Sequence, residues 1–119
     1  MSEITRHSTG PRMSKATVFN GVAYLCGQVP DNTDCDICDQ ARNMLEKVDT
    51  LLKEVGSDRK HVLSVIVYLR DMKDFAGFNS VWDTWFESGF APARACVEAR
   101  LARPELLCEV SVQAAVIAE

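Results

Sequence analysis

The stretch from His61 to Arg70, HVLSVIVYLR, constrains the fold of this chain more than any other segment. It is rich in β-branched residues and almost continuously apolar, which is typical of a central strand covered on both faces. A long segment with helical periodicity precedes it, and an aromatic-rich segment follows it. The sequence therefore predicts a buried strand between two helices.

The helix before this strand is expected from about Asp34 to Val55. Asp34 and Asp36 suit the positive end of the helix dipole, and Gly56 suits the position that closes the helix. Apolar residues spaced three and four apart predict one buried stripe. Its members are Ile37, Ala41, Met44, Leu45, Val48, Leu52 and Val55.

The second helix is expected from about Lys73 to Ser88, with Gly89 ending it and Pro92 preventing its return. Its aromatic residues are interpreted as core filling rather than as a cofactor site. The expected buried stripe is Phe75, Phe78, Trp82, Trp85 and Phe86.

Strands are expected at both ends of the chain. Asn20-Gly21 is a strong signal for a two-residue turn, and it predicts a hairpin between Ala16–Phe19 and Val22–Gly27. Two further strands, about Ala93–Leu101 and Leu106–Ile117, are expected to form a second hairpin.

The resulting element order, β-β-α-β-α-β-β, predicts one α/β (α+β) domain over residues 1–119. Its mixed sheet has both helices on one face. Residues 1–12 are polar and are expected to be partly flexible.

Side chains alternate between the two faces of a strand. This alternation predicts that Arg94, Cys96 and Glu109 emerge together on the face without helices. The chain has no spare segment to cover that semi-polar face, so a homo-oligomer with a site near the interface is expected. Spacing alone leaves an alternative open, in which Arg94 and Glu109 form a structural ion pair or point into water.

Composition narrows the function classes. The formal net charge is −4 and the basic residues are scattered, which argues against a nucleic-acid partner. No apolar run reaches the length of a membrane span, and the first residues lack the apolar core of a signal peptide. A cytoplasmic protein without a membrane partner is expected.

The five cysteines are expected to be free thiols, because their number is odd and no secretory signal is present. Cys35 and Cys38 have C-x-x-C spacing, but they lie in a polar, Asp-rich stretch without a second such pair or a nearby histidine. Two ordinary cysteines near a helix start are favoured over a redox motif or a metal site.

Three motifs together resemble one family. APARACVEARLARPELLCEV resembles the C-terminal signature of the RidA/YjgF (endoribonuclease L-PSP-like) family of enamine/imine deaminases. YLCGQVP resembles the SGQ-x-P strand end of that family, and VIVYLRDMKDFAGFNSVWDTWF resembles its helix-two segment. The resemblance runs from about Pro11 to Val116, and GPRMSKATVFNG is closest to a YoaB-like branch.

The resemblance implies a chorismate mutase-like fold, a homotrimer with active sites in the clefts between subunits, and no cofactor or metal. It implies that Arg94 grips the substrate carboxylate and that Glu109 holds or activates the attacking water. A guanidinium suits the first role because it offers two parallel donors to a carboxylate. The implied substrate-binding positions are Arg12, Cys26, Gly27, Asn79 and Cys96, with Cys96 interpreted as an apolar pocket wall. Two alternatives stay open: Asn79 as a polar helix residue satisfied locally, and Gly27 as a strand-end turn only.

Two of these positions depart from the family pattern. Cys26 stands where many members have serine, and Arg12 stands where many have an aromatic residue. Arg12 would add a second cation near the mouth of the cleft, so the physiological substrate stays open.

The resemblance implies hydrolysis of enamine/imine intermediates of the 2-aminoacrylate/2-iminopropanoate type to 2-keto acids and ammonia. This is the activity of a 2-iminobutanoate/2-iminopropanoate deaminase-like hydrolase. A non-catalytic protein that binds a small 2-imino or 2-keto acid, or regulates through it, is the alternative. A ribonuclease is the weakest interpretation, because the chain is acidic and His7 and His61 lie far apart in sequence.

Overall fold

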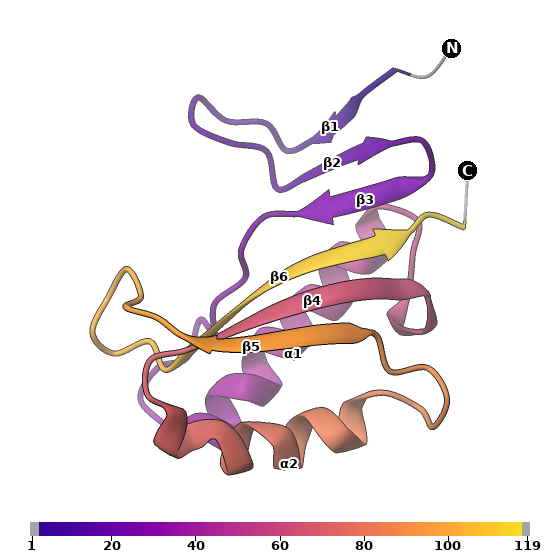
Figure 1. Cartoon of the computed structure of the whole chain (residues 1–119). Coiled ribbons are helices and arrows are strands. Elements are labelled where there is room, and N and C mark those ends of the chain that lie inside the picture. Colours follow the sequence, from indigo (N-terminus) through magenta and orange to yellow (C-terminus); the bar gives the residue numbers. More distant parts are fainter. Residues whose placement is uncertain (1–2, 118–119) are drawn as a thin grey trace.

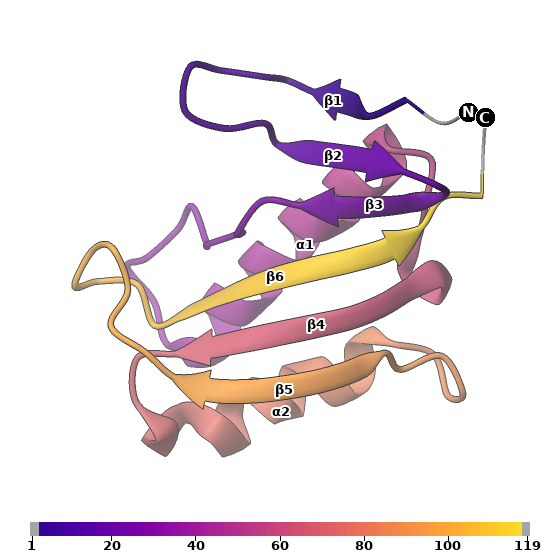
Figure 2. The same ribbon diagram turned by 45° about the horizontal axis from the view of Figure 1, so that its top comes forward.

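The computed structural model describes residues 3–117 and contains one six-stranded sheet with two α-helices packed on one face (Figures 1 and 2). The elements are β1 (Thr5–His7), β2 (Ala16–Phe19), β3 (Val22–Leu25), α1 (Ile37–Glu54), β4 (Val62–Leu69), α2 (Phe75–Trp85), β5 (Ala93–Glu98) and β6 (Cys108–Ala115), with 3-10 turns at Arg59–His61 and Met72–Asp74. The predicted mixed sheet with helices on one side is confirmed.

The sheet order is β1-β2-β3-β6-β4-β5, and only β4 and β5 run parallel. The expected hairpin between the last two strands is therefore wrong, because β4 lies between β5 and β6 (Figure 2). The crossover through α2 places β5 parallel to β4 at the sheet edge, and β6 occupies the other side of β4. Residues 99–107 connect β5 to β6 past the intervening strand β4.

The N-terminal hairpin is confirmed. Asn20 and Gly21 both have positive φ angles, 51° and 77°, as a tight turn between twisted strands requires. The sequence analysis did not anticipate strand β1, which pairs with β2 and extends the sheet by one edge strand inside the segment expected to be partly flexible. Residues 1 and 2 of that segment lie outside the described residues.

Helix α1 begins and ends close to the predicted positions. The Asp36 carboxylate caps its start by accepting a hydrogen bond from the Asp39 amide at 3.0 Å. Gly56, with a φ of 80°, closes its end, and the Ser57 amide donates to the Leu52 carbonyl at 2.9 Å. The predicted apolar stripe is buried against the sheet.

Helix α2 is shorter than predicted, and its expected stripe is only partly buried. Phe78 and Trp82 belong to the core, Trp85 and Phe86 are half-buried, and Phe75 at the helix start is 39% exposed. Among residues 3–117, no helix combines the length and the apolar character needed to cross a membrane.

The face of the sheet opposite the helices is open in the single chain. Large apolar side chains remain about half exposed there, and they are Tyr24, Ile66 and Val97. Strand β4 was predicted to be covered on both faces. In the single chain only its helix side is covered, where Val65 and Val67 are buried. A surface of this kind indicates an interaction site.

Candidate functional site

Arg94 is a half-buried cation held in place by neutral partners. Its guanidinium donates a hydrogen bond to Asn79 Oδ1 at 2.7 Å and lies 4.9 Å from the centre of the Trp82 ring. Among the described residues, no carboxylate lies within ion-pair distance of it. The guanidinium is thus oriented while several of its N–H groups stay free for an anionic ligand.

Helix α2 creates this environment through its periodicity. Asn79 and Trp82 are three residues apart, so they lie on one face of the helix, and Phe75 lies one turn before Asn79. The Phe75 ring centre is 5.9 Å from the Arg94 guanidinium carbon. Phe75 and Trp82 were interpreted as core residues. Their spacing of four and three residues from Asn79 was the sequence signal that could have linked them to the site.

Cys96 follows Arg94 on the same face of β5 and packs against the hydrophobic core. Burial raises the pKa of its thiol, and the nearby charge of Arg94 offsets only part of this effect. The thiol is therefore protonated near neutral pH and poorly suited to act as a nucleophile. Its expected role as an apolar pocket wall stays a prediction.

Glu109 lies on β6 directly against Gly27. A Cβ atom added to Gly27 would overlap Glu109 Oε2 and lie 3.2 Å from its Cδ atom. The pairing explains the approach: Tyr24 of β3 pairs with Gln113 of β6, and Gln28, beyond the end of β3, pairs with Val110. Four residue steps therefore face three, and the segment after β3 contains one extra residue. This β-bulge presses the backbone at Gly27 against the carboxylate.

The Glu109 carboxylate is half-buried, and burial raises its pKa above the usual carboxyl value. No hydrogen bond or ion pair to this carboxylate occurs among residues 3–117. The group is consequently available to accept a hydrogen bond from water or from a ligand.

Arg94 and Glu109 lie on opposite faces of the sheet, so the prediction that they share the face without helices is wrong. Arg94 is in register with Val65, whose side chain lies under the helices. Glu109 is in register with Tyr68 on the open face. The two residues are also two strands apart, about 10 Å across the sheet.

The prediction failed because it assigned the alternating side chains of β5 to the wrong faces of the sheet. Alternation alone placed the apolar Ala95 and Val97 toward the helices, but these residues are exposed. The Arg94 side chain takes the helix side instead, because its guanidinium finds a hydrogen-bond acceptor and an aromatic ring on α2. Glu109 lies on the open face as predicted.

The other predicted binding residues lie nearer to Glu109 than to Arg94 in the sheet. Cys26 is half-buried in the bulge beside Gly27, and its backbone amide donates to the Lys15 carbonyl at 2.8 Å. Arg12 is exposed in the loop between β1 and β2. The structure thus forms two sets of predicted residues: Asn79 and Cys96 lie with Arg94, and Gly27, with Cys26 beside it, lies with Glu109.

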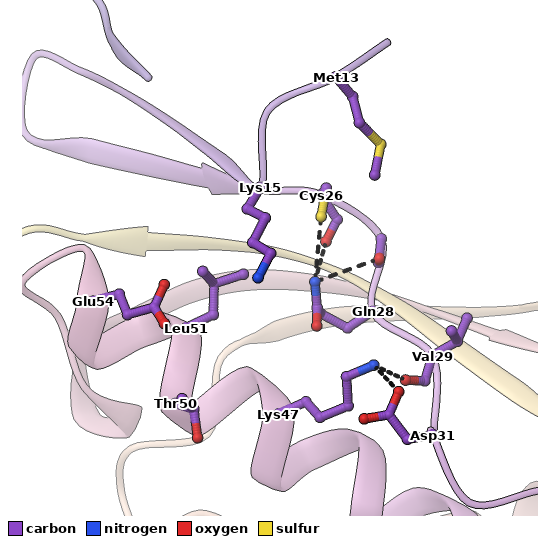
Figure 3. A pocket seen from close by; sticks show the side chains of 11 residues that line it. Met13, Lys15, Cys26, Gln28, Val29, Asp31, Lys47, Thr50, Leu51 and Glu54 are labelled. Atoms are coloured by element: carbon purple, nitrogen blue, oxygen red, sulfur yellow. Dashed lines mark hydrogen bonds and ion pairs between the residues drawn. The ribbon is translucent and has the colours of Figure 1, made fainter. Parts of the chain in front are cut away.

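A cavity of about 500 Å³ lies beside the second set, between the bulge and helix α1 (Figure 3). Cys26 and Gly27 belong to its lining, whereas Arg94, Asn79 and Glu109 do not. Its polar lining includes Lys15, Lys47 and Gln28, none of which the sequence analysis singled out. No sequence signal linked these residues, since the bulge and the α1 packing bring them together.

The remaining cysteines behave as expected of structural thiols. All five are free, and desolvation of Cys35, together with the negative charges of the acidic residues around it, raises the pKa of its thiol. Burial raises the pKa of Cys108 to about 12. No cluster of histidine, cysteine and acidic residues that could hold a metal ion occurs within residues 3–117.

The fold and the motifs define a class of protein. The family model described as Endoribonuclease L-PSP matches residues 5–116, so the chain belongs to this family, which is the RidA/YjgF family that the three motifs resemble.

Relatives in this family cover nearly the whole chain. A RutC family protein of Haemophilus ducreyi is 37% identical over 95% of this chain and 97% of its own length. The RutC family protein YoaB of Escherichia coli is 36% identical over 95% of this chain and 98% of its own length. The crystal structure of NMB1025, a YjgF family member from Neisseria meningitidis, superposes with a TM-score of 0.94 at 45% identity and covers 98% of both chains.

Proposed function

We propose that this protein hydrolyses 2-imino acids and their enamine tautomers to 2-keto acids and ammonia. In the reaction, water adds to the carbon of the protonated imine, the carbon–nitrogen bond breaks, and the products are a ketone oxygen and an ammonium ion. The observation that carries the proposal is Arg94, a half-buried guanidinium oriented by Asn79 at 2.7 Å without an acidic partner among the described residues.

Arg94 would bind the substrate carboxylate through two parallel N–H donors. The neutral Asn79 fixes the guanidinium plane without neutralising its charge, so the arginine is ready before the substrate arrives. Cys96 would form the apolar wall beside the bound anion.

Glu109 would accept a hydrogen bond from the attacking water and orient it toward the imine carbon. Its raised pKa brings the carboxyl group closer to neutral pH, where it is a stronger base than an exposed glutamate. Cys26 and Gly27 would complete this half of the pocket, and Arg12 would contribute a second cation at its mouth.

The two halves require two chains. Within one chain Arg94 and Glu109 face opposite sides of the sheet, so one small substrate cannot reach both. We propose that Arg94 of one protomer faces Glu109 of a neighbour in the homotrimer that the family resemblance implies. The exposed apolar residues of the open face support such an assembly.

The assembly predicts a strong effect of a charge at Ile66, which is 43% exposed on the open face. Ile66→Glu is expected to weaken subunit association by about 100-fold or more, because an unpaired carboxylate is costly to bury. Sedimentation velocity would measure the shift toward monomers. Phe90→Glu, at a residue that is 40% exposed in the loop after α2, is the control and should leave association unchanged. Equal effects of the two substitutions would argue against an interface on the open face.

A second prediction concerns the bulge. Gly27→Ala is expected to lower kcat roughly 10- to 100-fold, because the added methyl group displaces the Glu109 carboxylate. Gly10→Ala is the control, since its Cβ would meet only the Met13 carbonyl at an ordinary 3.7 Å. Steady-state assays of the two variants would compare them, and a fully active Gly27→Ala protein would contradict the placement of Glu109.

The decisive test is turnover. The purified protein should accelerate the release of ammonia and pyruvate from 2-aminoacrylate generated by a coupled enzyme, and Arg94→Ala should not. A protein that binds 2-ketobutyrate but never accelerates imine loss would instead be a non-catalytic binding protein of the same fold.

RNA cleavage has little support from the histidines, despite the description of the family model. His61 Nδ1 lies 2.6 Å from Asp58 Oδ1, directly before strand β4. His7 lies on β1, and three strands separate β1 from β4. The two rings therefore do not form a pair for acid-base catalysis.

A further inference from the structure

Apart from Cys26 and Gly27, the residues that line the cavity beside the bulge have no role in the proposed hydrolysis. It lies between helix α1 and the loop after β3, and the side chains that border it are drawn in Figure 3. Its volume of about 500 Å³ is within the range of small-molecule sites.

The lining carries two cations and two carboxylates. Lys47 Nζ donates to the Val29 carbonyl at 2.8 Å and to Asp31 Oδ1 at 2.9 Å, which leaves one of its three N–H groups free. Lys15 and Glu54 also border the cavity, and neither takes part in an ion pair among residues 3–117.

The floor of the cavity adds a buried amide and an apolar surface. The Gln28 side chain is 9% exposed and lies between Lys15 and Lys47 (Figure 3). Its amide nitrogen makes only long contacts of 3.3 to 3.5 Å within the loop. Leu51 and Val29 supply the apolar part of the lining.

These features select one class of ligand. A simple anion would meet two carboxylates in the cavity, and a simple cation would meet two lysines. A molecule with one carboxylate and one ammonium group matches the pattern, because Lys15 and Lys47 can receive the first and Glu54 and Asp31 the second. An apolar side chain on this molecule would cover Leu51.

We infer that this cavity is a second small-molecule site, which binds a free α-amino acid with an apolar side chain. The site is separate from the position of the substrate carboxylate at Arg94. Gly27 lines the cavity and also contacts Glu109, so a ligand in the cavity lies one backbone segment away from the proposed water-activating group.

The test is a titration of the full-length protein with L-leucine, in which binding is monitored through the NMR resonances of the backbone amides. Saturable shifts are expected for residues 26–31 and 47–54. Two leucine analogues test the contribution of each charged group separately: 4-methylpentanoate keeps only the carboxylate, and 3-methylbutylamine keeps only the amine. Each analogue should bind about tenfold more weakly than leucine.

Variants locate the site. Lys15→Gln and Glu54→Gln are each expected to weaken leucine binding roughly three- to tenfold, as removal of one exposed charge partner does. Lys53→Gln is the matched control, because this lysine is on the same helix, is 74% exposed at its side chain and does not line the cavity. Arg94→Ala should leave leucine binding intact.

Three results would overturn the inference. They are the absence of saturable shifts in residues 26–31 and 47–54, loss of leucine binding in Arg94→Ala, and equal weakening by Lys15→Gln and Lys53→Gln. Equal affinity for leucine and 4-methylpentanoate would show a carboxylate site and would overturn the amino-acid assignment.

Discussion

Replacement of Arg94 by alanine is expected to lower kcat/KM for 2-imino acids by about 100-fold or more. The variant would lose the two charge-assisted hydrogen bonds that Arg94 is proposed to donate to the substrate carboxylate, and each such bond is worth about 1.5–3 kcal/mol. The fold should survive, because Arg94 lies on an edge strand and contacts one amide and the aromatic rings of α2.

Arg94→Lys separates charge from geometry. Lysine keeps the positive charge but cannot offer two parallel donors while bonding to Asn79, so it is expected to recover only a small part of the activity. Arg100→Ala removes an exposed arginine just beyond β5 and is the control. Steady-state kinetics of the three variants, with circular dichroism to confirm folding, would measure the effect. A wild-type rate for Arg94→Ala would eliminate the proposed carboxylate site.

Glu109→Gln is expected to reduce kcat by about 100- to 10,000-fold, the range typical of losing a general base. KM should change little, because Glu109 is proposed to contact the water rather than the substrate carboxylate. Glu46→Gln, at an exposed position on α1, is the control. An active Glu109→Gln protein would show that the water is oriented by other groups.

The raised pKa of Glu109 leads us to expect two effects of pH, one on activity and one on thermal stability. The proposed role of Glu109 uses its carboxylate form, and burial raises its pKa, so kcat/KM should fall with decreasing pH at a higher pH than for an ordinary glutamate. Because the folded-state pKa exceeds the unfolded one, ionisation of Glu109 favours unfolding. Glu109→Gln should therefore raise Tm at neutral pH, and this gain should vanish at acidic pH, where wild-type Glu109 is protonated. Thermal unfolding across pH would test this point.

The core of the fold was predictable because local patterns and burial agree. The three-and-four spacing along α1, the Asn20-Gly21 turn and the apolar run of β4 each specify an element without reference to distant residues. The family resemblance predicted Arg94, Asn79 and Glu109 as site residues, and the structure brings the first two within 2.7 Å of each other.

The strand partners were less predictable, because pairing depends on which sheet edge is free when a strand arrives. The short connection between the last two strands favoured a hairpin, but the crossover through α2 places β5 on the outer edge of β4. Strand β1 was missed for a related reason: it is three residues long and exposed, so its sequence carries no burial pattern.

By itself, the sequence determined the order of the elements, the stripe that each helix buries and the family to which the chain belongs. These properties follow from the spacing of residues along the chain. Only the tertiary structure decided that Arg94 faces α2 while Glu109 faces the open side. Which face each residue of an edge strand occupies depends on the tertiary contacts that its side chains make. Here the contacts of Arg94 with an amide and a tryptophan ring on α2 placed it on the helix side, although the apolar pattern of β5 favoured the opposite assignment.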